Sequence, residues 1–251
     1  MERVAMQVTV LGGRGAWPAA GAACSGFLVE SDGFRILLDA GYAVLPELLR
    51  HVGAHEIDAV LITHGHPDHC ADLNPLLRAR HLADTPAPAL PVYAPPHALD
   101  AVLALDRPGM LDEACDLREF IPGVGFALGP FAVATRLLPH WVPNAGFRLT
   151  AGGRSLAYTG DSGPDRGVIE LAEAADLLIA EATYPETVPP ADAPFLTSAR
   201  QAAEQAAKAR AGRLMLTHLW PGTDEARAVR AAARAFPGRI DVAASDLVVE
   251  I

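Results

Sequence analysis

The sequence contains few cysteines. It has three in 251 residues, and Cys24, Cys70 and Cys115 are widely spaced and form no Cys-x-x-Cys pair. A disulfide framework or a thiolate metal site needs cysteines in even number or at close spacing. We therefore expect each of the three to be a small packing residue.

Positive charge is also scarce. The formal net charge is -10, and the 20 basic residues include a single lysine, Lys208. Proteins that grip nucleic acid without sequence preference present a basic face, because their affinity comes from phosphate contacts. The acidic balance thus argues against a large polyanionic substrate without excluding a small one.

Long apolar runs are missing. None reaches the roughly 18 residues needed to span a bilayer, and the first eleven residues carry Glu2 and Arg3, unlike a secretory signal. Hydrophobic residues still make up 51% of the chain, which is ample for a buried core. We expect a soluble, cytoplasmic protein with no membrane partner, in which residues 1–251 form a single domain.

Short apolar or alternating runs predict strands, and longer periodic stretches predict helices. The predicted strands cover residues 7–11, 26–30, 34–39, 59–63 and 90–93, several segments within 126–157, and residues 177–180, 214–217, 240–243 and 247–251. The predicted helices cover residues 46–52, 67–77, 168–175, 198–211 and 224–235. Each half contributes strands and then helices, an order that two β-sheets packed face to face with helices outside accommodate.

One segment packs four potential metal ligands into six residues: His64-Gly65-His66-Pro67-Asp68-His69. Side chains two apart in an extended segment face the same way, so His64 and His66 can bind one ion. Pro67 suits the first turn of a helix, which would swing Asp68 and His69 toward a second ion. Such spacing strongly indicates a metal site.

Two histidines cannot complete a metal site, so further ligands must come from elsewhere in the chain. His64 and His218 each directly follow a threonine at the end of a predicted strand, and Asp161 comes two residues after Thr159. His140 is a third candidate, and Asp161 could bridge two ions through its two oxygens. Imidazole and carboxylate without thiolate favour zinc, with manganese and iron as alternatives.

These residues resemble the metallo-β-lactamase superfamily, whose mark is His-x-His-x-Asp-His. The resemblance is strongest to its ribonuclease Z-like branch, through residues 140–148, Thr159-Gly160-Asp161 and Glu181-Ala182-Thr183-Tyr184. It implies an α/β fold, the αββα sandwich of two mixed sheets with helices on the outer faces. It also implies two divalent ions, the first held by His64, His66 and His140, the second by Asp68, His69 and His218, with Asp161 between them. Asp39 is expected to orient a ligand histidine.

The chain departs from ribonuclease Z in three places. It has no Gly- and Lys-rich arm for tRNA, Leu196 falls where the proton-donating histidine stands, and Leu219-Trp220 replaces an Arg-Tyr pair. Glu181 is present without its usual partner. These losses argue against tRNA as a partner and favour a small-molecule substrate.

The expected reaction is hydrolysis by a hydroxide that bridges the two ions. Asp68 or Asp161 could accept the proton of the attacking water, and Glu181 or water could protonate the leaving group, so Asp68 and Glu181 are the catalytic candidates. The expected substrate is a small phosphodiester, with a lactone or thioester as the alternative. Specificity is expected to lie in the loops 86–106 and 183–195.

Two other functions deserve comparison. Diiron redox members of the superfamily prefer a glutamate where this chain has His66, which favours hydrolysis. A binding protein without activity would be expected to have lost some ligands, whereas all seven are present. Related proteins often form dimers, which leaves both a monomer and a homodimer open.

Overall fold

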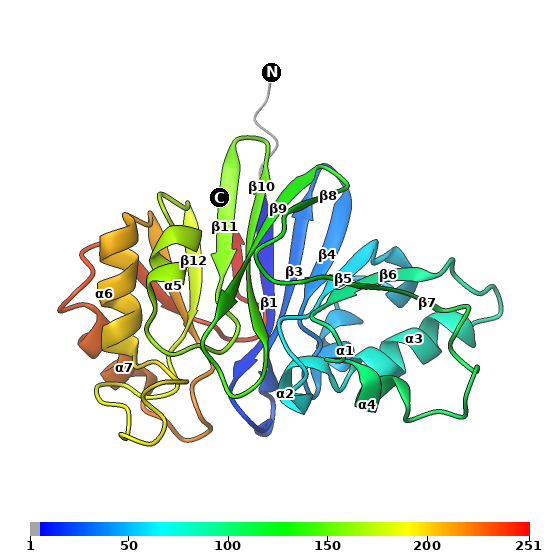
Figure 1. Ribbon diagram of the computed structural model, residues 1–251, viewed down its shortest axis with the longest axis horizontal. Helices are drawn as coiled ribbons and strands as arrows, with labels where there is room; N and C mark the ends of the chain where they lie inside the picture. Colours follow the sequence, from blue (N-terminus) through cyan, green and yellow to red (C-terminus); the bar gives the residue numbers. More distant parts are fainter. Residues whose placement is uncertain (1–5) are drawn as a thin grey trace.

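Two β-sheets lie face to face in the computed structural model, which describes residues 6–251. Helices cover the outer face of each sheet (Figure 1). This arrangement confirms the predicted αββα sandwich. The first five residues, with Glu2 and Arg3, lie outside the described residues. Within 6–251, no helix has the length and apolar character needed to cross a membrane.

The first sheet runs in the order β15-β1-β3-β4-β5-β6-β7, with β2 paired to β1. Its strands are β1 (Gln7–Arg14), β2 (Ala23–Cys24), β3 (Gly26–Ser31), β4 (Phe34–Leu38), β5 (Ala59–Leu61), β6 (Leu90–Ala94), β7 (Cys115–Glu119) and β15 (Val248–Glu250). Strands β4 to β7 are parallel and the pairs β15-β1, β1-β3 and β3-β4 are antiparallel, so the sheet is mixed. The accompanying helices are α1 (Val44–Leu48), the short 3-10 helix η1 (Ala54–Glu56), α2 (Pro67–Cys70), α3 (Leu73–His81) and α4 (Asp100–Leu103).

The second sheet runs in the order β14-β13-β12-β11-β10-β9-β8. Its strands are β8 (Phe126–Leu128), β9 (Phe131–Leu138), β10 (Asn144–Ala151), β11 (Arg154–Tyr158), β12 (Leu177–Glu181), β13 (Arg213–Thr217) and β14 (Arg239–Val242). Strands β8 to β11 form an antiparallel meander, and β11 to β14 are parallel. Its helices are α5 (Arg166–Leu171), α6 (Ala199–Ala209) and α7 (Glu225–Ala232).

Apolar side chains fill three layers, one between the sheets and one under each set of helices. Phe27 of the first sheet meets Tyr158 of the second edge to face, with ring centroids 5.2 Å apart. On the outer face of the second sheet, alanines of α6 lie against the strands, and Ser198 caps this helix together with Gln201. The packed layers give the loops at the sheet ends a rigid support.

Most predicted elements are present, one predicted helix is divided, and four described elements were not predicted: the two-residue strand β2, the short 3-10 helix η1, β7 and α4. Strand β7 and helix α4 were not predicted, because β7 is a partly exposed edge strand without alternation and α4 has only four residues. The helix predicted over residues 67–77 is divided into α2 and α3. At the division, the Asp72 backbone N–H donates to Ala40 O, and its carboxylate accepts from Leu45 N, both at 2.8 Å.

The three cysteines are free, as predicted. Cys24 and Cys70 are buried, and Cys115 is half-buried. Burial raises the pKa of Cys24 and Cys70 to about 12 and that of Cys115 to about 11. All three therefore stay protonated near neutral pH and act as small apolar groups.

Candidate metal centre

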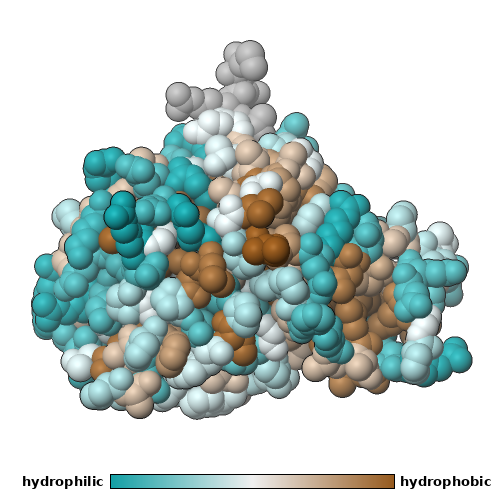
Figure 2. Space-filling model, viewed as in Figure 1, coloured by the Kyte–Doolittle hydropathy of each residue, from teal (hydrophilic) through white to brown (hydrophobic). Residues whose placement is uncertain are grey.

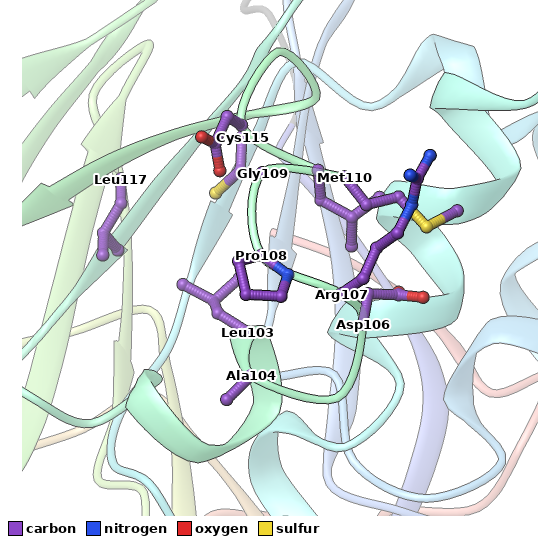
Figure 3. A pocket seen from close by; sticks show the side chains of 11 residues that line it. Leu103, Ala104, Asp106, Arg107, Pro108, Gly109, Met110, Cys115 and Leu117 are labelled. Atoms are coloured by element: carbon purple, nitrogen blue, oxygen red, sulfur yellow. The ribbon is translucent and has the colours of Figure 1, made fainter.

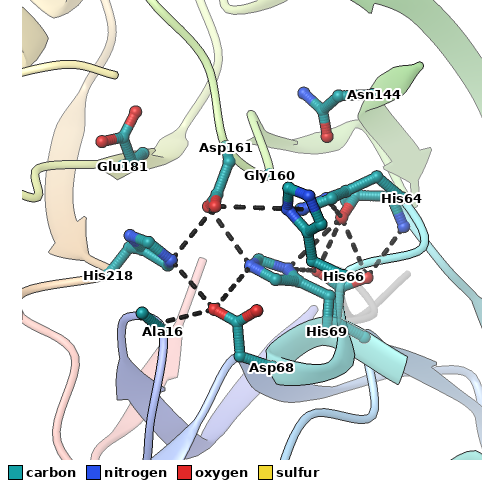
Figure 4. Close-up of polar contacts among 12 residues, drawn as sticks. Ala16, His64, His66, Asp68, His69, Asn144, Gly160, Asp161, Glu181 and His218 are labelled. Atoms are coloured by element: carbon teal, nitrogen blue, oxygen red, sulfur yellow. Dashed lines mark hydrogen bonds and ion pairs between the residues drawn. The ribbon is translucent and has the colours of Figure 1, made fainter. Parts of the chain in front are cut away.

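The seven predicted ligands, although up to 154 positions apart in sequence, converge from both sheets on one place. Figure 4 labels all of them except His140. They form two groups, and Asp161 belongs to both. The first contains His64, His66, His140 and Asp161, and the second contains Asp68, His69, Asp161 and His218. Within each group the candidate ligand atoms all lie within 4.8 Å of one another. This is the division that the family resemblance implied.

In the first group, three ring nitrogens face one another. His66 Nδ1 lies 3.1 Å from His64 Nε2 and 3.1 Å from His140 Nε2. The other nitrogens of two rings are occupied: His64 Nδ1 lies 3.0 Å from Thr63 Oγ1, and His140 Nδ1 lies 3.1 Å from the Phe195 carbonyl, which can only accept. His140 therefore carries its proton on Nδ1 and directs the lone pair of Nε2 inward.

The second group joins two imidazoles and two carboxylates. Asp161 places Oδ1 3.2 Å from His69 Nε2 and Oδ2 3.1 Å from His218 Nε2. Asp68 Oδ2 lies 3.2 Å from His218 Nε2 and accepts a hydrogen bond from the Ala16 backbone N–H at 2.8 Å. The same Asp161 carboxylate also lies 3.9 Å from His64 Nε2, so its oxygens stand between the two groups.

Two buried atoms of the second group lack a hydrogen bond. His69 Nε2 and Asp161 Oδ1 are both inaccessible and, although close, are not aligned to bond each other. Leaving a buried polar atom unpaired costs about 1–3 kcal/mol. A cation between these atoms would remove that cost, and oxygen and imidazole nitrogen are suitable donors for zinc, manganese or iron. The residues present therefore fit a divalent metal.

The two groups differ in their electrostatics. Burial lowers the pKa of His64, His66 and His140, which keeps these rings neutral and able to bind a metal. Burial acts the same way on His218, but the Asp161 and Asp68 carboxylates outweigh it and raise its pKa to about 10. The carboxylates of Asp68 and Asp161 in the second group therefore attract a positive charge, which can be a proton or a metal ion.

Further residues hold the ligands in place. The Asp39 carboxylate accepts from His69 Nδ1 at 2.7 Å, as predicted for a residue that orients a ligand histidine. It also accepts hydrogen bonds from the Thr63 backbone N–H and from the Tyr158 hydroxyl. On the other side, Thr183 Oγ1 accepts from His218 Nδ1 at 2.8 Å and donates to Glu181 Oε1 at 2.7 Å. Thr183 lies in the motif Glu181-Ala182-Thr183-Tyr184, but its contact with His218 could not be predicted from the sequence.

Glu181 is placed differently from a free proton donor. Its side chain is buried at the end of β12, and its two oxygens accept from the backbone N–H groups of Ser162, Thr183 and Thr197. Burial and then the charge of Asp161 raise its pKa to about 8. Glu181 thus links, through hydrogen bonds, the segments that contain Ser162, Thr183 and Thr197. A catalytic role for Glu181 remains a prediction. Leu196, beside Thr197, is buried.

Gly160 explains how Asp161 reaches both groups. Its φ is +57°, and a Cβ atom there would come within 2.4 Å of Asn144 Oδ1 and 2.8 Å of Thr63 Cβ. A larger residue would therefore be strained and would collide with Asn144 of β10 and with Thr63, two residues after β5. Figure 4 shows Gly160 between Asn144 and Asp161.

Aromatic side chains stand around the centre. Trp141 packs on His140 and on Phe195, and Trp220 packs on Trp17 and Tyr184. Trp17 and Trp141 are each about half exposed. Phe147, close to His140 in sequence, lies instead in the core between the sheets.

The chain is similar to known proteins in both sequence and structure. Residues 34–219, which include all seven ligands, match the model of the Beta-lactamase superfamily domain. The chain is 32% identical to the probable metallo-hydrolase YhfI of Bacillus subtilis, covering 98% of this chain and 100% of that one. The crystal structure of YhfI superposes with a TM-score of 0.90 at 31% identity, covering 99% of this chain and 100% of the other.

Similarity extends to ribonuclease Z. The enzyme of Mycolicibacterium gilvum is 29% identical, over 94% of this chain and 93% of its own length. The crystal structure of the short form of human tRNase Z has a TM-score of 0.76 at 24% identity, covering 97% of this chain and 98% of that one. These similarities agree with the branch that the motifs indicated.

Proposed function

The chain belongs to the metallo-β-lactamase superfamily, in its ribonuclease Z-like branch, and is a metal-dependent hydrolase; we propose that it uses two divalent ions, zinc by preference, to hydrolyse a small phosphodiester-type substrate. One observation carries this proposal. Seven ligand side chains converge in two groups that share Asp161, and two of their buried atoms lack any hydrogen bond. If these side chains served only to stabilise the fold, we would expect both atoms to have hydrogen-bond partners within the protein.

Bound divalent ions would supply Lewis acidity and bring the pKa of a water molecule close to neutrality. His64, His66 and His140 would hold one ion, Asp68, His69 and His218 the other, and Asp161 would contact both. The side chains themselves fix the geometry: Asp39 and the Phe195 carbonyl set which nitrogen of His69 and His140 carries the proton.

Proton transfer falls to the carboxylates of the centre. Asp68 is mostly buried, yet only one of its oxygens, Oδ2, accepts from Ala16 and faces His218. The other oxygen, Oδ1, makes neither of these contacts, so it is better placed than Oδ2 to accept a proton from the attacking water. Glu181, enclosed by three backbone donors, would instead hold the centre in shape.

The substrate is expected to tolerate a weak proton donor. Leu196 supplies no proton where the branch has a histidine, so the leaving group must be good or must take its proton from water. A small phosphodiester meets this condition, and so do lactones and thioesters, which we keep as the alternative. With its net charge of -10, the chain is not expected to bind tRNA.

The test is a hydrolysis screen. Zinc-loaded and manganese-loaded protein would be offered bis(4-nitrophenyl) phosphate, a γ-lactone and an acyl thioester, alongside Asp161→Ala and the exposed control Asp84→Ala. We expect turnover of the phosphodiester, at least a hundredfold less with Asp161→Ala, and no change with Asp84→Ala. Absence of turnover on all three substrates would support a binding protein instead, and stoichiometric iron with redox-linked absorbance would support redox chemistry.

A further inference from the structure

A small hollow lies directly beside the metal-binding motif. It has a volume of about 250 Å³ and is bounded by α2, α4 and the loop after β4. Its walls include Tyr42, Gly65, Pro67, Ala101, Val102 and Leu105. None of the nine described residues that line it carries a charged side chain.

The hollow and the metal centre share a wall. Gly65 and Pro67 line the hollow, and His66 between them belongs to the first ligand group. A Cβ atom on Gly65 would lie 2.5 Å from the Ala98 carbonyl oxygen, so the turn before α4 packs directly on the motif backbone. His66 is only partly buried. The hollow therefore lies next to the backbone that carries His66, a ligand candidate of the first group.

Large apolar side chains at this hollow are left in water. Tyr42 is 38% exposed and Leu105 is 69% exposed. Figure 2 shows apolar residues at the lower right of the molecule, over the part that carries α3, α4 and β7. Exposed apolar groups around a concavity commonly mark a place where a ligand is bound.

A second hollow on the other side of α4 differs in character. It has a volume of about 550 Å³, and Asp106, Arg107 and Asp112 are among its lining residues (Figure 3). Its lining contains no chain neighbour of a ligand, whereas the lining of the first hollow contains Gly65 and Pro67 on either side of His66. Ala104 faces this second hollow, whereas Ala101, three residues earlier, faces the first.

We propose that the hollow between α2 and α4 is a specificity subsite that binds an apolar part of the substrate, a single ring or a short alkyl chain, while the scissile group lies at the metal centre. This inference rests on the proposed function for the position of the scissile group. Such a subsite would select, among small phosphodiesters, those with an apolar substituent. The walls would exclude a charged substituent, because they offer it no partner.

The test compares two anions that differ only in their apolar part. Phenylphosphonate and methylphosphonate would be titrated calorimetrically into the zinc-loaded protein, and neither requires turnover. We expect phenylphosphonate to bind at least tenfold more tightly, because its ring is removed from water. Ala101→Phe should fill the hollow and reduce the ratio to near one, with methylphosphonate binding unchanged. Ala104→Phe, three residues later and facing the second hollow, should keep the ratio.

A second variant keeps the test decisive if Ala101→Phe does not fold. Leu105→Asn changes an exposed side chain and should lower the ratio at least threefold. A ratio near one in the unchanged protein, or a tenfold ratio that survives both Ala101→Phe and Leu105→Asn, would overturn the subsite. If the ratio behaves as expected but no ester is hydrolysed, the subsite stands and the proposed function fails. If esters are hydrolysed and the ratio is near one, the proposed function stands and the subsite fails.

Discussion

Asp39 Oδ2 lies 2.7 Å from His69 Nδ1, and both side chains are completely buried. The carboxylate comes from the end of the first sheet's β4, and the histidine comes from α2. Because Asp39 holds the proton of His69 on Nδ1, the lone pair of Nε2 is directed at Asp161 and the second ligand group. The hydrogen bond thus fixes both the tautomer and the orientation of a candidate ligand.

Asp39→Asn should weaken metal binding by about tenfold to a hundredfold, the usual effect of losing a partner of a ligand histidine. The amide would turn a donor toward Thr63, His69 or Tyr158, each of which donates to Asp39. Zinc affinity would be measured by competition with a chromophoric chelator. Asp58→Asn, at an exposed position, serves as the control. Equal affinities in Asp39→Asn and the unchanged protein would refute the orienting role.

Glu181→Gln should lower the stability of the metal-free protein by about 1–3 kcal/mol at pH 9, where Glu181, with its pKa of about 8, is a carboxylate, because the amide cannot accept from all its backbone donors. Urea unfolding of the chelator-treated protein measures this change. Glu173→Gln, on the surface, is the matched control. If Glu181 acts only as a proton donor, its variant will lose activity while the unfolding curve stays where it was.

Asp176→Asn should destabilise the protein by about 1–2 kcal/mol at pH 7. Burial would raise the pKa of Asp176, but hydrogen bonds from Ser155 and the Arg154 guanidinium lower it below 3.8. A carboxyl with a lowered folded-state pKa stabilises the fold above its unfolded value, and that stabilisation is lost as the pH falls. The gap between the two unfolding curves should therefore narrow below pH 3.8. A gap that is constant from pH 7 to pH 3 would contradict this assignment, and Asp84→Asn should show no gap.

Zinc should raise the melting temperature of the stripped protein. Free zinc at a hundred times its dissociation constant adds about 2.7 kcal/mol to stability, equivalent to about 5–10 °C for a chain of this size. Differential scanning calorimetry with and without zinc measures the change. Asp161→Ala, which contacts both groups, should respond far less. Identical melting temperatures with and without zinc in the unchanged protein would show that the centre does not bind zinc.

The ligands could be predicted from sequence because metal chemistry limits the choice of side chain and spacing. His64, His66, Asp68 and His69 are close in the chain, and their convergence follows from a strand end turning into a helix at Pro67. A bridging role for Asp161 was predicted from its two oxygens and from the resemblance, but nothing local in the sequence brings residue 161 beside residue 64. Their contact depends on the two sheets packing face to face.

Other features could not be predicted because they depend on backbone atoms. His140 is oriented by the Phe195 carbonyl, and Asp68 by the Ala16 N–H, groups that every residue type carries. Strand β7 was missed because an edge strand exposed on one side lacks a buried pattern. The hollow beside Gly65 was also out of reach, since small apolar residues on a short helix are common without any ligand.

The most direct test of the account is the number of ions that the centre binds. Chelator-stripped protein would be titrated with zinc in a calorimeter, together with His140→Ala and His218→Ala, which each remove one ligand from a different group. The account predicts two zinc ions per chain in the unchanged protein and one tight ion in each variant. Binding of one ion or none to the unchanged protein, or of two equally tight ions to both variants, would contradict it.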